Sequence, residues 1–116
     1  ALTIEANEGE PFEALTVGAA SGVGFVFELM IYWQEWLEEH NFEPQVAREM
    51  TVQTFLGAAK LAQKSSATSL DQLLSNVTSK KGVTAAGLQS MRELEIERGL
   101  RYSFEKAVMR DQELSK

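Results

Sequence analysis

The chain has 116 residues, of which 44% are apolar and 24% charged, with a net charge of −6, no cysteine and one histidine. These values predict one globular domain, and the acidic balance argues against a nucleic-acid partner, whose protein surface is usually basic. The lack of cysteine excludes disulfides and zinc–thiolate sites, and a single histidine excludes a multi-histidine metal site within one chain. We expect a cytoplasmic protein without a metal centre.

The first eleven residues are predicted to be a linker. Residues 1–4 alternate like the end of a strand, and residues 5–11 (EANEGEP) are acidic and rich in turn formers. We expect this segment to enter from an upstream domain that the chain lacks. The folded domain is then residues 12–116, and it opens with a helical turn over residues 12–17 that has Pro11 at its start.

The stretch over residues 15–37 organises the rest of the sequence (LTVGAASGVGFVFELMIYWQEWL). Small residues open it, and from residue 23 onward apolar side chains occupy nearly every helical face, which predicts an enclosed helix over residues 22–40. A membrane span needs roughly 20 predominantly apolar residues and basic flanks. Here the apolar run is shorter, contains Glu28 and has acidic flanks. We therefore predict a buried central helix, partly enclosed by a second copy of the chain, and no membrane partner.

Four further helices are expected after the central one. Asn41 is a stop signal, and Pro44 opens a helix that runs to about residue 64. Residues 65–68 form a polar loop, after which Ser69 and Gln72 make a capping-box pattern for a short helix through residue 77. A helix over residues 84–98 and another over residues 100–114 follow, with Gly99 stopping or kinking the chain between them. The sequence thus predicts an all-α domain of five or six helices.

Helical spacing also predicts which faces pack. Gly57 is a poor helix former, so we expect another backbone to come close to it. The apolar stripes of the helices over residues 44–64 and 100–114 are expected to be Val46, Met50, Phe55, Ala58 and Leu61, and Leu100, Phe104, Ala107 and Val108.

The loop over residues 77–88 (VTSKKGVTAAGL) is the most informative polar stretch. It leads directly into a helix, whose first N–H groups lack intrahelical partners and lie at the positive end of the helix dipole. Ser, Gly and Thr residues at this position suit a carboxylate or phosphate, while the simpler role for Thr84 is to cap the helix; the two roles are compatible. Lys80 and Lys81 either add positive charge to such a site or are simply solvated.

Other polar and aromatic residues give weaker signals. Glu28 is either a buried acid or lies in an exposed groove or against a partner. His40 is interpreted as a surface residue rather than a general base, and Trp33 and Trp36 as core or interface residues. The sequence has no Ser/His/Asp set, metal cluster or glycine-rich nucleotide fingerprint, so a complete active site does not fit within the chain.

Three blocks resemble a known family. Residues 12–16 (FEALT) and 19–27 (AASGVGFVF) are similar to F-D-A-x-T-A followed by S-G-S-G-P-A-Y-V-F. Residues 53–60 (QTFLGAAK) keep Q-T-x-x-G-A-A-K intact, and residues 77–88 are similar to V-T-S-P-G-G-T-T-x-x-G-L. In these blocks, over most of its length, the chain resembles the C-terminal domain of pyrroline-5-carboxylate reductases.

The resemblance implies a helical dimerisation domain of the 6-phosphogluconate dehydrogenase C-terminal-like type, interlocked with a second subunit as a homodimer or higher oligomer. It implies reduction of 1-pyrroline-5-carboxylate, a small-molecule carboxylate, to L-proline in proline biosynthesis. NAD(P)H would be bound by the missing N-terminal domain and not by this chain, which would be inert alone. By resemblance, the residues that hold the substrate carboxylate are Ser79, Gly82, Val83 and Thr84, with the Thr84 hydroxyl nearest the substrate ring.

The chain departs from the family pattern at five positions. Lys80 and Lys81 replace Pro-Gly in the loop, Val23 and Gly24 replace Pro-Ala, and Ala20 replaces a glycine. Proline fixes φ near −65° and glycine permits positive φ, so the loop path or stiffness should differ. Two hypotheses follow: a related reductase, with a bulkier or more anionic substrate if the substrate differs, or a non-catalytic helical dimerisation module that has lost reductase activity.

Overall fold

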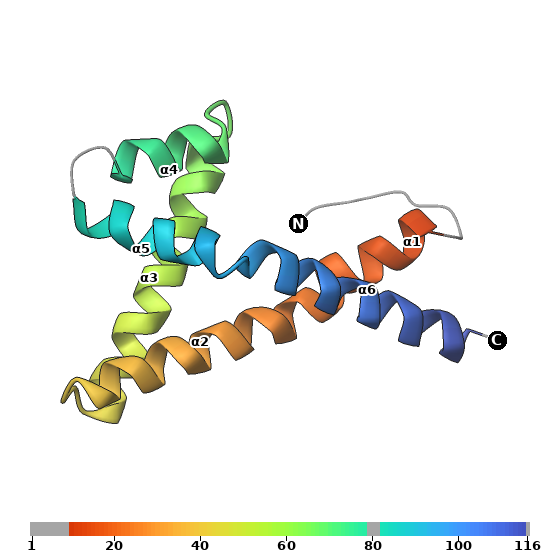
Figure 1. Cartoon of the computed structure of the whole chain (residues 1–116), viewed down its shortest axis with the longest axis horizontal. Coiled ribbons are helices and arrows are strands. Elements are labelled where there is room, and N and C mark those ends of the chain that lie inside the picture. Colours follow the sequence, from red (N-terminus) through yellow and green to blue (C-terminus); the bar gives the residue numbers. More distant parts are fainter. Residues whose placement is uncertain (1–9, 79–81, 116) are drawn as a thin grey trace. The chain divides into compact units, whose positions relative to one another are not determined.

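The computed structural model describes residues 10–78 and 82–115, and every regular element in these ranges is a helix (Figure 1). Helix α1 (Glu10–Leu15) continues through a π-helical segment, η1 (Thr16–Ser21), into α2 (Gly22–Glu39). The chain then forms α3 (Pro44–Lys64), α4 (Leu70–Thr78), α5 (Gly82–Glu93) and α6 (Ile96–Leu114). The predicted all-α class is confirmed. Residues 1–9 of the expected linker lie outside the described residues, whereas residues 10 and 11 already belong to α1.

The glycine-rich lead to the central helix is itself helical. Residues 16–21 form the π-helix η1, in which the Thr16 hydroxyl donates to the Phe12 carbonyl oxygen at 3.2 Å. Small side chains at Gly18, Ala19 and Ala20 leave room for the wider π turn. The apolar helix is therefore longer than the sequence analysis expected: the stretch Phe12–Glu39 has 28 residues and a mean hydropathy of 1.7 over its most apolar window. By length and composition alone, this is the one described stretch that is able to cross a membrane.

The end of α2 is confirmed at Asn41. This residue has a φ of 73°, in the left-handed region that asparagine tolerates better than most residues. The Phe42 N–H donates to the Leu37 carbonyl oxygen at 3.3 Å, and the Asn41 N–H donates to the Glu38 carbonyl oxygen at 3.0 Å. This pair of hydrogen bonds is the Schellman arrangement that closes a helix C-terminus, so α2 ends sharply before Pro44 opens α3.

The chain divides into two compact units, the first formed by residues up to 28 and from 95 onward. In this unit α6 packs on α1, η1 and the start of α2, and Val17 of η1 is buried. The Phe25 and Phe104 rings lie 5.5 Å apart, and the Gln112 side-chain amide donates to the Glu13 carboxylate at 2.8 Å. Phe104 therefore belongs to the packing face of the last helix, as its spacing predicted.

The second unit contains residues 29–94. Here the buried residues of α3 are the small Ala47 and Thr51, and the Thr51 hydroxyl donates to the Ala47 carbonyl oxygen at 2.8 Å. Phe55, one turn further along the same face, meets Trp33 of α2 edge to face at 5.0 Å. Within a single chain, Val46, Met50, Ala58 and Leu61 of the expected stripe are exposed, and Phe55 is its one half-buried residue.

The break before the last helix does not occur at Gly99. The expected boundary is wrong by several residues: α5 ends at Glu93, and Gly99 lies inside α6, where its N–H donates to the Glu95 carbonyl oxygen at 3.2 Å. Glu95 adopts left-handed backbone angles, with φ of 54° and ψ of 46°. A single left-handed residue ends the hydrogen-bond ladder of one helix and allows the next to begin at Ile96.

Burial within one chain is sparse. Among the described residues, only Val17, Ala47 and Thr51 are buried, and α2 contributes none of them. One chain therefore does not supply the enclosure that we expected for the central helix. Apart from its own helix, no described part of the chain lies within 4 Å of a methyl group built on Gly57, so the backbone expected to approach this glycine is not found among the described residues.

Candidate functional site

The candidate anion site begins at the first turn of α5. Helix α5 begins with Gly82, Val83 and Thr84. Their N–H groups lack an intrahelical partner, because no residue of the helix lies four positions before them to supply a carbonyl oxygen. The helix dipole adds a partial positive charge at the same place. Val83 is 85% exposed and Thr84 is half-buried, so solvent and small anions reach this turn. N–H groups without an intrahelical acceptor, together with the dipole, can hold a carboxylate or a phosphate.

Three of the four predicted site residues are thereby placed on one helical turn. The fourth, Ser79, lies outside the described residues, as do Lys80 and Lys81. The simple capping role expected for Thr84 is wrong, because α5 begins two residues earlier at Gly82 and Thr84 is its third residue. Glycine is a poor helix former in a helix interior, but in the first turn its N–H needs no intrahelical acceptor, so the helix extends back through it.

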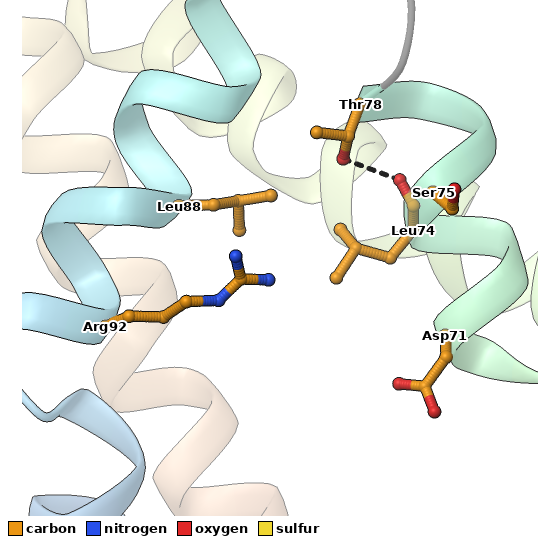
Figure 2. A pocket seen from close by; sticks show the side chains of 6 residues that line it. All are labelled: Asp71, Leu74, Ser75, Thr78, Leu88 and Arg92. Carbon is orange, nitrogen blue, oxygen red and sulfur yellow. Dashed lines mark hydrogen bonds between the residues drawn. The ribbon is translucent and has the colours of Figure 1, made fainter.

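The side chain of Thr84 shares a helical face with Leu88 and Arg92, since the three are spaced four residues apart. Leu88 and Arg92 line an open groove of about 370 Å³ between α4 and α5, whose other wall is one face of α4. Figure 2 shows both side chains projecting from α5 towards Leu74 and Thr78 of α4. The groove is lined by Asp71, Leu74, Ser75, Thr78, Leu88 and Arg92.

The polar groups of this groove differ in their hydrogen bonding and charge. The Thr78 hydroxyl donates to the Leu74 carbonyl oxygen at 2.6 Å, which fixes its proton on its own helix. Asp71 lies in the first turn of α4 and Arg92 in the last turn of α5, where each charge complements the helix dipole. The ion pairs found between described residues all lie within residues 95–113. Neither Asp71 nor Arg92 therefore forms a salt bridge with another described residue. The groove is thus polar at its charged end and apolar at Leu74 and Leu88.

This groove was not predicted from the sequence. In the sequence, Asp71 and Arg92 are separated by most of α4, the loop after it and most of α5. They line the same groove because α4 and α5 pack antiparallel to each other. One signal was available: Arg92 follows Thr84 by eight residues, which places both on the same face of a helix. That spacing says nothing, however, about which helix lies opposite.

Two other candidates lie elsewhere. Glu28 is exposed on α2, so it is not a buried acid within a single chain. His40 is exposed at the end of α2, with its Nδ1 atom 2.9 Å from the Trp36 carbonyl oxygen and its ring 4.1 Å from the Trp36 ring. This confirms His40 as a surface residue that covers the last turn of α2.

Both tryptophans of α2 are exposed in a single chain. Trp33 packs against Phe55 but is still 47% exposed, Trp36 is 57% exposed, and the two line a shallow aromatic hollow of about 350 Å³ with Tyr32. A core role within one chain is therefore wrong, and the interface role stays a prediction. Within residues 10–78 and 82–115, no cluster of three metal-ligating side chains is found.

Comparison with known proteins adds a clear similarity. A family model described as pyrroline-5-carboxylate reductase dimerisation matches residues 10–114. The chain is 30% identical over 112 residues to the pyrroline-5-carboxylate reductase of Haemophilus influenzae, which covers 97% of this chain and 41% of that protein. It is 31% identical over 113 residues to pyrroline-5-carboxylate reductase 1 of Bacillus subtilis, which covers 97% of this chain and 37% of that protein. The chain thus spans about two fifths of the length of these relatives.

Proposed function

Because the chain belongs to the pyrroline-5-carboxylate reductase dimerisation family, we propose that it is the dimerisation and substrate-binding domain of an oxidoreductase that reduces 1-pyrroline-5-carboxylate to L-proline. The supporting observation is the position of Gly82, Val83 and Thr84 in the first turn of α5. The block that resembles the family's substrate loop is therefore also the place where this fold offers unpaired N–H donors.

The proposed role of this turn is to bind and orient the substrate. The N–H groups of Gly82 and Val83 donate to the carboxylate, and the helix dipole offsets part of its negative charge. The Thr84 hydroxyl then lies next to the ring of the substrate, where it positions the ring carbon that accepts the hydride. Arg92 lies about 12 Å further along the helix axis, at 1.5 Å per residue, and is too distant to bind the same carboxylate. Orientation of this kind lowers the barrier by fixing the reacting groups before the chemical step.

The hydride donor is proposed to be NAD(P)H, bound by a part of the protein outside this chain. Dinucleotide fingerprints require a strand, a glycine-rich turn and a helix in succession. The described residues form helices only, so they do not fit such a cofactor. We therefore propose that the chain alone has no reductase activity and that the active enzyme is a cytoplasmic protein of about the length of the relatives.

We propose a homodimer or a higher oligomer as the working assembly. The family is a dimerisation family, and α2 has no buried residue within a single chain although most of its side chains are apolar. Exposed apolar surface of this extent is typical of an interface. The alternative, a dimerisation module that has lost its activity, shares this assembly and differs only at the substrate site.

Titration of proline into the ¹⁵N-labelled chain, followed by NMR, tests the site. We expect the amide signals of Gly82, Val83 and Thr84 to shift in a saturable manner, while the amide of Gly99 in α6 serves as the control. Equal shifts at all glycines would indicate a non-specific effect of the added solute. Saturable shifts confined to residues other than those of α5 would refute the assignment of the site.

Thr84→Ala tests the same site by kinetics, in a protein of the length of the relatives. Loss of a hydrogen bond to a charged or polarised substrate costs about 1.5–3 kcal/mol, so we expect kcat/KM for 1-pyrroline-5-carboxylate to fall roughly 10- to 100-fold. Thr68→Ala is the matched control, because Thr68 is also half-buried and lies in the loop before α4. If Thr84→Ala retains wild-type kinetics, the hydroxyl has no role in the reaction.

Measuring NADPH and NADH oxidation with 1-pyrroline-5-carboxylate separates the two hypotheses. A reductase gives turnover in the protein of full length and none in the isolated chain. Absence of turnover in both, with the dimer intact, favours the assembly module. Turnover by the isolated chain would show that the cofactor binds to the chain itself.

A further inference from the structure

The open groove between α4 and α5 has the dimensions of a site for a small molecule. Its volume of about 370 Å³ lies at the lower end of the range of ligand pockets, which is about 300–1,000 Å³. Its wall on α4 runs from Asp71 to Thr78, a length of about 10 Å at 1.5 Å per residue. A groove of this length suits a compact ligand better than an extended segment of a partner protein.

Two opposite charges border one end of this groove. Figure 2 shows the Arg92 guanidinium group reaching from α5 towards α4, while the Asp71 carboxylate lies on the opposite wall. The two groups do not pair with each other, because the ion pairs between described residues all lie within residues 95–113. Glu93, the carboxylate next to Arg92 in the sequence, accepts a hydrogen bond from Gln89 at 3.1 Å on another face of α5. The charged end of the groove therefore offers donors to an anion and an acceptor to a cation.

The floor of the groove beside these charges is apolar. Leu74 of α4 is 37% exposed, and Leu88 of α5 is half-buried. Asp71 precedes Leu74 by three residues and Arg92 follows Leu88 by four, so each charge lies about one turn from a leucine on its own helix. The helix dipoles account for each charge at its helix end, but not for the aliphatic surface beside the pair. A ligand in this groove meets two opposite charges at one end and this aliphatic surface next to them.

We propose that this groove binds a zwitterionic α-amino acid with an aliphatic side chain. The α-carboxylate pairs with Arg92, the α-ammonium group pairs with Asp71, and the side chain covers Leu74 and Leu88. An α-amino acid carries both charges on groups attached to one carbon, so it meets both walls of the groove at once. Hydrogen bonds between charged groups are the strong ones, and the aliphatic side chain removes the surface of both leucines from water.

This groove is distinct from the first turn of α5. Arg92 lies about 12 Å from Thr84 along the helix axis, at 1.5 Å per residue. A ligand of the size of leucine that is anchored at Arg92 reaches Leu88, about 6 Å away along the axis, and not Thr84. The groove is therefore independent of the proposed reductase function, which would stand even if no amino acid bound here.

Titration of L-leucine into the chain, labelled with ¹³C at its own leucine methyl groups, tests the site by NMR. We expect the methyl signals of Leu74 and Leu88 to shift in a saturable manner. The methyl signals of Leu100 in α6 serve as the control and should stay unchanged, because Leu100 is exposed to a similar extent, at 39%, and lies outside the groove.

Two fragments of the same ligand separate the contributions of its charges. Isoamylamine is L-leucine without its carboxylate, and isocaproate is L-leucine without its ammonium group. Each fragment leaves one charge of the groove without a partner. We therefore expect each to bind at least about tenfold more weakly than L-leucine.

Two variants connect the binding to the named side chains. Asp71→Asn and Arg92→Gln each remove one charge at an exposed position, and we expect each to raise the Kd for L-leucine at least about tenfold. Arg98→Gln is the matched control, because Arg98 is an exposed arginine of α6 outside the groove, and its Kd should equal that of the wild type.

Several results would overturn the proposal. The first is the absence of saturable shifts at Leu74 and Leu88 up to the solubility limit of L-leucine. Equal affinity for isocaproate would show a site for anions only, and equal affinity for isoamylamine a site for cations only. Saturable shifts confined to residues 82–84 would place the amino acid at the first turn of α5 instead.

Discussion

Glu95 adopts a backbone conformation that residues with a side chain rarely take. Its φ of 54° places Cβ close to the following carbonyl group, which costs roughly 1–2 kcal/mol for a residue other than glycine. The Glu95 carboxylate forms an exposed ion pair with Arg98 at 3.6 Å, but exposed ion pairs contribute little to the free energy of folding and do not offset this cost.

Glu95→Gly should therefore stabilise the protein. Relief of the strain exceeds the extra backbone entropy that glycine loses on folding, so we expect a gain of about 0.5–1 kcal/mol in the free energy of unfolding. Glu105→Gly in the interior of α6 is the control, and it should lose about 1 kcal/mol. Urea denaturation at a fixed protein concentration measures both, and a destabilised Glu95→Gly would contradict the strain.

Residues of this kind limit what the sequence predicts. Asn41 was identified correctly as the end of α2, because asparagine is common at left-handed positions and Pro44 follows closely. Glu95 was missed, because glutamate is an ordinary helix former and Gly99 nearby gave a stronger but misleading signal. For Gly82, Val83 and Thr84, the helix start was predicted to within two residues. The groove beside them depends on which helix packs opposite, and this is not encoded in local spacing.

At the scale of the element, α4 depends on its cap. This helix has only nine residues, a length at which isolated helices are marginal in water. The predicted capping pattern is confirmed in its first half, because the Gln72 N–H donates to the Ser69 hydroxyl at 3.1 Å. The Gln72 side chain, however, donates to Asn76 at 2.8 Å instead of reaching back to Ser69.

Ser69→Ala should remove this cap and destabilise the protein by about 0.5–2 kcal/mol. Ser69→Asp should retain most of the stability, since aspartate caps equally well. Ser66→Ala, in the exposed turn before α4, is the matched control. Thermal unfolding followed by circular dichroism measures the three variants, and an unchanged midpoint for Ser69→Ala would show that tertiary contacts alone hold α4.

Helix faces were predicted less well than helix ends. The sequence assigned the large apolar residues of α3 to the packing face, whereas the buried positions are Ala47 and Thr51. Periodicity reports how apolar a face is, but not whether its partner belongs to the same chain.

For the whole molecule, the small number of buried residues has a thermodynamic consequence. If folding is coupled to association, stability depends on protein concentration by mass action, at about 1.4 kcal/mol for each tenfold change. We expect the Tm to fall by about 3–6 °C on tenfold dilution, as measured by calorimetry or circular dichroism. A Tm that stays constant across a hundredfold range would show that each chain folds alone.

The sequence predicted the need for a second copy because one small domain can hardly enclose a helix such as α2. It did not predict how far the chain falls short of enclosing it. Pairing preferences between helices arise from three-dimensional packing, and the expected burial of α2 was derived from its composition only. The extent of exposed surface therefore follows from the three-dimensional packing and not from composition.

The π-helical segment η1 has a consequence for insertions and deletions. A π-type turn contains one residue more than the corresponding α-helical turn, so the segment behaves as a single inserted residue within one long helix. Deleting Ala19 should therefore restore an unbroken α-helix while α1 keeps its rotational position relative to α2, because a turn of either kind closes one full rotation. The hydrogen bond between Glu13 and Gln112 should then be retained. A deletion within the α-helical part of the same stretch would instead rotate α1 by about 100°, so η1 is the place where the helix can lose a residue and still present the same side of α1 to α6.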